Sequence, residues 1–69
     1  MAEVRITVNG EARELPGPAT LHDLLHHLGL DPRTVVVEHN RQIVRRPALS
    51  DTALAPGDMV ELVHFVGGG

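Results

Sequence analysis

Hydrophobic and polar side chains alternate at the start of the chain. Every second position of residues 3–8 is Val or Ile, which is the period of a strand with one buried face. Asn9-Gly10 follows and is the strongest short signal for a hairpin turn. Residues 11–15 are therefore predicted to return as a second, weaker strand, which the Pro-Gly-Pro sequence at 16–18 ends.

Four leucines after this hairpin predict one helix. Their spacing of i, i+3, i+4 and i+7 places them on a single stripe that faces a core: Leu21, Leu24, Leu25 and Leu28. Thr20 is suited to be the N-cap, with its hydroxyl accepting a hydrogen bond from the backbone N–H of Asp23. Gly29 ends the helix, because glycine takes the left-handed conformation without steric cost.

β-branched residues predict further strands in the second half of the chain. Residues 34–38 form a strand, residues 39–41 a turn, and residues 42–44 a short strand that Pro47 stops. Residues 48–55 lack a clear period and are predicted to be a short turn or 3₁₀ segment, with two leucines directed inward: Leu49 and Leu54.

The end of the chain combines an apolar strand with a glycine triplet. A turn at 55–58 leads to a last strand over residues 59–66, which is apolar enough to lie centrally, beside the first strand. Gly67-Gly68-Gly69 have no side chains to pack, so we expect a flexible tail. The predicted organisation is a domain over 1–66 and a tail over 67–69.

The order β-β-α-β-β-β predicts an α+β fold with two layers. A mixed sheet of four to five strands would pack on one main helix. With 69 residues the chain has room for one domain, which buries roughly 60% of the surface exposed by its unfolded form.

Composition narrows the function classes. The net charge of −3 and the absence of a basic run argue against nucleic acid as a partner. No apolar stretch approaches the ~20 residues that span a membrane, and no leader is evident, so we expect a soluble cytoplasmic protein. There is no cysteine, which excludes a sulfur nucleophile within the chain, and all six basic residues are arginine.

Several motifs together indicate which group of proteins the sequence resembles. They run the length of the chain: Val8-Asn9-Gly10, residues 20–28, Val37-Glu38-His39-Asn40 with Ile43-Val44-Arg45-Arg46, Pro56-Gly57-Asp58, and Phe65-Val66-Gly67-Gly68-Gly69. In these features the chain resembles the ubiquitin-like β-grasp carriers. Among them it most resembles the ThiS family, the sulfur carriers of thiamin thiazole biosynthesis.

This resemblance implies a reaction sequence that partner proteins perform. An E1-like adenylating enzyme of the ThiF type would use ATP to adenylate the Gly69 carboxylate. A persulfide donor would convert the product to a C-terminal thiocarboxylate, and a thiazole synthase of the ThiG type would take the sulfur. The chain itself would bind no cofactor and would not be an enzyme.

The tail residues suit that role chemically. A chain without Cβ atoms fits a narrow channel and bends freely, so Gly67 and Gly68 would thread into a partner's active site while Gly69 reacts. By the same reasoning, a side chain at position 68 would clash in the channel.

The last strand also predicts a docking surface. If its even positions face the helix, then Met59, Val63 and Phe65 point to the open face of the sheet. Phe65 is the single aromatic residue and is suited to anchor a partner, with Arg5 at the rim.

The histidines give a weaker signal. His22 and His26 are spaced i, i+4 and could meet one metal ion, with His39 as a distant third ligand. The leucine stripe places the helix histidines on or near the solvent face, so we expect no metal site. No constellation of catalytic residues is evident either.

Other roles share the same fold and tail. The alternatives are a sulfur carrier for molybdopterin or for tRNA thiolation, a ubiquitin-like modifier joined to target lysines, and an interaction domain with an inert tail. The partner, rather than the tail, distinguishes these roles.

Overall fold

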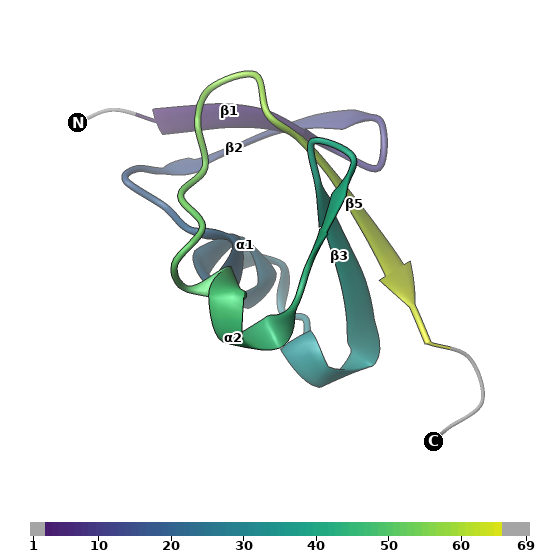
Figure 1. Ribbon diagram of the computed structural model, residues 1–69. Helices are drawn as coiled ribbons and strands as arrows, with labels where there is room; N and C mark the ends of the chain where they lie inside the picture. Colours follow the sequence, from purple (N-terminus) through teal and green to yellow (C-terminus); the bar gives the residue numbers. More distant parts are fainter. Residues whose placement is uncertain (1–2, 66–69) are drawn as a thin grey trace.

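The alternating residues at the start of the chain form the first strand of a mixed sheet in the computed structural model, which describes residues 3–65 (Figure 1). The five strands are arranged in the order β2-β1-β5-β3-β4. The elements along the chain are β1 (Glu3–Val8), β2 (Glu11–Pro16), α1 (Leu21–Leu28), the 3₁₀ helix η1 (Pro32–Thr34), β3 (Val35–His39), β4 (Gln42–Val44), α2 (Arg46–Leu49) and β5 (Met59–His64).

The last strand, β5, lies in the centre of the sheet. It runs parallel to β1, with Thr7 opposite Met59 and Val8 opposite Val60, and antiparallel to β3. The hairpins β1–β2 and β3–β4 complete the two sides. This confirms the predicted mixed sheet and the predicted pairing of the first strand with the last.

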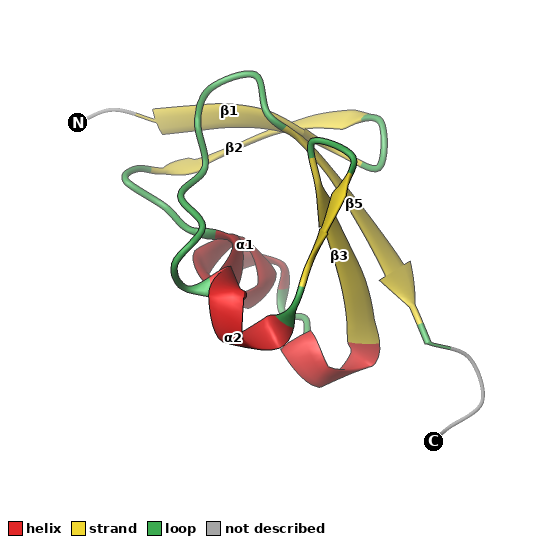
Figure 2. Cartoon of the chain, in the orientation of Figure 1, coloured by secondary structure: helices red, strands yellow, loops and turns green. Residues whose placement is uncertain are grey.

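The helix α1 packs across one face of the sheet, and Figure 2 shows α2 beside it. The core between the sheet and the helices consists of buried apolar side chains from both layers. It includes the leucines predicted to face inward: Leu21, Leu24, Leu25, Leu49 and Leu54. Leu28 is only partly buried because it ends the helix at the edge of the core. None of the helices among residues 3–65 is long and apolar enough to cross a membrane.

The ends of α1 form as the sequence predicts. The Thr20 hydroxyl accepts a hydrogen bond from the Asp23 N–H at 3.2 Å, and the Asp23 carboxylate accepts one from the Thr20 N–H at 2.8 Å. This reciprocal pair satisfies two N–H groups that lack partners within the helix. Gly29 caps the other end with φ +73°, in the left-handed region.

The structure corrects the prediction around Pro47. The sequence predicts a turn or a 3₁₀ helix over 48–55. The structure instead has a single α-helical turn over Arg46–Leu49, which begins before the predicted segment. Pro47 lies in the first turn of this helix, where its missing N–H leaves no hydrogen bond unmade. Thr34 also belongs to η1 rather than to β3, so that strand is shifted by one residue.

The last strand is shorter than predicted, since β5 ends at His64. Val66 and the proposed tail, Gly67 to Gly69, lie outside the described residues. The predicted boundary between a domain over 1–66 and a tail over 67–69 therefore stays a prediction.

Candidate functional site

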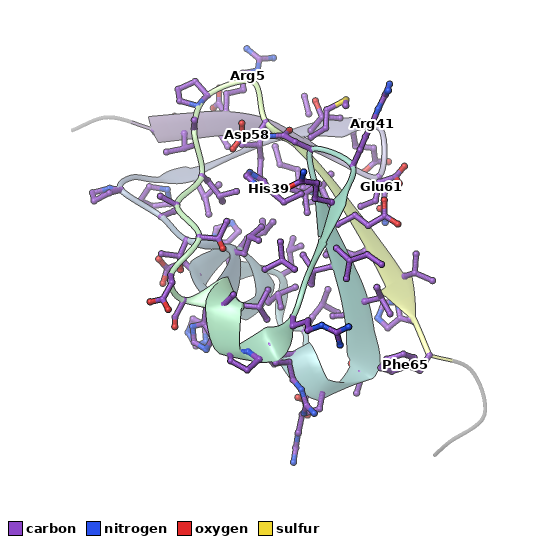
Figure 3. The ribbon with its side chains drawn as sticks, viewed as in Figure 1. Arg5, His39, Arg41, Asp58, Glu61 and Phe65 are labelled. Carbon is purple, nitrogen blue, oxygen red and sulfur yellow. The ribbon has the colours of Figure 1, made fainter. Side chains whose placement is uncertain are left out.

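Exposed apolar side chains gather on the face of the sheet opposite α1. In β5 the side chains of Val60 and Leu62 are buried against the helix, while Met59 and Val63 alternate with them and are 46% and 57% exposed. Phe65 follows at the same period and is 63% exposed (Figure 3). The predicted placement of these three side chains on the open face is confirmed.

Ile43 joins this surface and was missed by the sequence analysis. It lies opposite Glu38, which lies opposite Glu61 on β5, so the three side chains share the open face. Ile43 is 66% exposed. We call Ile43, Met59, Val63 and Phe65 the apolar face; these are the large hydrophobic residues that the structure leaves exposed within residues 3–65.

Charged side chains also lie on the open face, among the apolar ones. Glu61 lies between Met59 and Val63 along β5, and Glu38 lies beside it on β3. With Arg41 and Met59 these two carboxylates line a hollow. Arg5 lies on β1, with a guanidinium nitrogen 3.9 Å from the Glu14 carboxylate and a largely exposed side chain. By the alternation of β1 it shares the open face with Thr7, which lies opposite Met59, so Arg5 lies beside the apolar face, as predicted.

Phe65 lies at the end of this face that is opposite Met59. Its N–H donates to the Thr34 carbonyl at 3.0 Å, which holds the backbone beside η1 after β5 has ended. Gly67, the first of the predicted tail residues, follows two positions later in the sequence. A partner that contacts the apolar face would therefore lie close to the start of the glycine tail.

A polar cluster that the sequence analysis did not identify holds the β3–β4 turn against the turn that precedes β5. Asp58 accepts hydrogen bonds from His39 Nε2 at 2.7 Å, the Ala55 N–H at 2.9 Å and Asn40 Nδ2 at 3.2 Å (Figure 3). Burial alone would raise the pKa of Asp58. The hydrogen bonds from Ala55, His39 and Asn40 outweigh that effect and hold the pKa below its ordinary value.

The environment of His39 differs from that of His22 and His26, the other two histidines considered as metal ligands. His22 and His26 lie exposed on α1, whereas His39 is engaged with Asp58. Within residues 3–65, no group of three or more His, Asp and Glu side chains is arranged to hold a metal ion.

Known proteins resemble both the sequence and the fold. The family model for the ThiS family matches residues 6–69. The chain is 40% identical over 50 residues to a protein of Bacillus subtilis named "Sulfur carrier protein ThiS", covering 72% of this chain and 76% of that protein.

A second relative is much longer. The chain is 39% identical over 66 residues to a protein of Paramagnetospirillum magneticum named "Thiazole synthase". The match covers 96% of this chain but only 20% of that protein, so the chain spans about one fifth of its length.

A solved structure shares the whole fold. The crystal structure of the thiamine biosynthesis protein (ThiS) from Geobacter metallireducens superposes with a TM-score of 0.81 at 33% identity, covering 96% of this chain and all of that one. A designed protein based on the template of human erythrocytic ubiquitin also matches, with a TM-score of 0.56 at 27% identity. The predicted ubiquitin-like β-grasp fold is thereby confirmed. With a family model that extends over almost the entire sequence, the chain belongs to the ThiS family.

Proposed function

We propose that the protein is a sulfur carrier of thiamin biosynthesis, and that Gly69 carries the sulfur as a thiocarboxylate. The observation that carries this proposal is the match to the ThiS family, which continues through the glycine triplet to residue 69. The relative named as a sulfur carrier supports the role. The protein acts as a co-substrate of its partners rather than as a catalyst.

The reaction starts by making the carboxylate a better acyl donor. A carboxylate oxygen is a poor leaving group, so an E1-like adenylating enzyme uses ATP to form an acyl adenylate at Gly69 and releases pyrophosphate. The terminal sulfur of a persulfide then attacks the acyl carbon, and AMP leaves. A thiol cleaves the S–S bond of the resulting acyl disulfide, which yields the thiocarboxylate and a new disulfide.

The acceptor of the sulfur is a thiazole synthase. Support comes from the relative named "Thiazole synthase", because a segment similar to this chain occurs within that longer protein. Joining a carrier segment to a synthase would place the tail of the carrier near the active site that receives the sulfur. The separate chain would reach the same active site by docking.

The apolar face would dock the partners. Phe65, Val63 and Ile43 present apolar area that the fold leaves open to water, and burying such area is favourable. Arg5 would contribute at the rim. Because the Phe65 backbone is held beside η1, docking there would bring the glycines that follow it to the partner's active site.

Mass spectrometry of the intact protein tests this function. The chain is incubated with the E1-like enzyme of its host, ATP and a persulfide source with a thiol reductant. We expect one terminal oxygen to be replaced by sulfur, and no replacement in a variant that lacks Gly69.

An unchanged mass would contradict the proposal if the same enzyme preparation loads another carrier. The loaded protein is then mixed with thiazole synthase and its other substrates. Loss of the sulfur with formation of the thiazole supports the thiamin role, whereas stable attachment of the chain to lysines of other proteins would support a protein modifier.

A further inference from the structure

A groove opens where β4 ends before its partner strand does. Val44 lies opposite Val37, but β3 extends further, to Val35, and pairs on its other side with β5. After Val44 the chain turns away through Arg45 into α2, so no strand lies on the β4 side of this part of β3. The result is a groove of about 330 Å³ between β3, α2 and η1.

Apolar side chains and arginines share the lining of this groove. Its walls include Val36, Ile43 and Phe65, two of which belong to the apolar face. Its rim carries Arg33, Arg45 and Arg46, which are half of the six basic residues of the chain. All three arginines are exposed. We call this feature the arginine groove.

The positive charge in the arginine groove is only partly compensated. Arg33 forms an ion pair with Asp31 at 2.9 Å. Within residues 3–65, no carboxylate lies within 4.0 Å of the guanidinium groups of Arg45 and Arg46. By contrast, Arg5 and Arg13 each have a carboxylate nearby.

The positive charge of Arg46 nevertheless acts on the nearby carboxyl group of Asp31. The pKa of Asp31 is lowered to about 2, first by the hydrogen bonds from Arg33 and in smaller part by the positive charges of Arg33 and Arg46. The groove is thus a local positive site on a protein whose net charge is −3.

We propose that the arginine groove docks an acidic segment of the adenylating partner, in which a carboxylate pairs with Arg45 and Arg46 and a neighbouring apolar side chain packs against Ile43 and Phe65. This inference rests on the proposed function. Arginine offers a carboxylate two parallel N–H donors, and the apolar walls suit a peptide better than a small anion. Phe65 belongs to the groove wall, so the contact would fix the direction in which the following glycines leave.

The absence of lysine from the chain makes a direct test available. Replacing Arg46→Lys or Arg45→Lys keeps the charge and introduces the only side-chain amine. A carbodiimide then links that amine to any carboxylate in ion-pair contact, and peptide mass spectrometry identifies both residues. The probe is the adenylating enzyme of the host, and Arg13→Lys on β2 is the matched control.

We expect position 46 or 45 to be joined to an Asp or Glu of the enzyme, and position 13 to give no such product. Binding measured at low salt should weaken on the order of tenfold in the double variant Arg45→Glu with Arg46→Glu, and little in Arg13→Glu. The difference should shrink as salt is added, because salt screens exposed charges.

Three outcomes would overturn the inference: no link from position 45 or 46, equal linking from position 13, or a link from position 46 to Gly69 of the same chain. The last would show that the chain's own end occupies the groove. Intact mass on the same samples separates the two proposals. If the wild-type protein acquires sulfur while the groove variants bind and link like the control, only the arginine groove is refuted.

Discussion

Asp58 connects two turns that are distant in sequence. It accepts hydrogen bonds from His39 and Asn40 at the β3–β4 turn and from Ala55 at the start of its own turn. Asn40 completes the connection, since its side-chain oxygen accepts from the Met59 N–H at 2.9 Å. One carboxylate therefore holds the turn that precedes β5 against the neighbouring hairpin.

Asp58→Asn should destabilise the fold by about 1–3 kcal/mol, because it removes a charged acceptor and leaves partly buried donors poorly paired. The folded pKa of Asp58 is depressed, so its contribution is fully present above the ordinary pKa of 3.8 and is lost as the pH falls through the lower folded value. Urea unfolding across this range measures the effect.

The control for Asp58 is Asp51→Asn, because Asp51 is exposed and its side chain makes no hydrogen bond or ion pair with residues 3–65. The stability difference between the wild type and Asp58→Asn should narrow below pH 3.8. A difference that stays constant through that range would show that the ionised carboxylate is not the source.

A second prediction for single residues concerns Gly68. Under the proposed function, Gly68→Val should strongly reduce adenylation, because the branched side chain would clash in the channel that receives the tail. The measurement is ATP–pyrophosphate exchange with the E1-like enzyme. Unfolding by urea should be unchanged, and adenylation at the wild-type rate would contradict the threading role.

Among the elements, α1 follows most directly from local sequence. Its leucine spacing, its N-cap and its closing glycine all lie within ten residues of one another, so short-range patterns suffice to predict them. α2 was not predicted, because a single turn has too few residues to show a period. There Pro47 has the fixed φ that suits a first helical turn, yet it also marks the end of a strand.

Thr20→Ala should destabilise the protein by about 1 kcal/mol, since the Asp23 N–H loses its acceptor and the reciprocal cap is broken. Thr20→Ser retains the hydroxyl and should recover most of the loss. The midpoint of urea unfolding provides the comparison. Equal destabilisation by both substitutions would indicate that the methyl group, rather than the cap, is responsible.

The site was predictable only where a strand was long enough. β5 has six residues, so its alternation placed Met59 and Val63 on the open face, and the same period placed Phe65. β4 has three residues, too few to define which way Ile43 points without its pairing to β3. The contact between His39 and Asp58 spans 19 positions and depends on tertiary structure, which no local pattern contains.

At the scale of the whole molecule, the two faces of the sheet are divided between stability and recognition. The helix side contains the apolar core, and the described residues include no buried polar side chain. The open side contains the apolar face, with Glu38 and Glu61 among its side chains. Substitutions on the two sides should therefore have different consequences.

Phe65→Ala should leave the free energy of unfolding within about 0.5 kcal/mol of the wild type, because the ring is mostly exposed. It should raise the carrier concentration that half-saturates the adenylating enzyme. Steady-state adenylation over a range of carrier concentrations measures this. The control His26→Ala, on the solvent side of α1, should leave half-saturation unchanged. An unchanged value for Phe65→Ala would place docking elsewhere.

The central position of β5 also has a mechanical consequence. A partner that grips the residues after Phe65 and pulls would load β5 along its own axis. Because the hydrogen bonds of an antiparallel ladder lie across the strands, those to β3 would be sheared together rather than opened one at a time, and those to β1 would share the load. Repeated insertion and withdrawal of the chain end could thus be tolerated without unravelling the sheet that presents it.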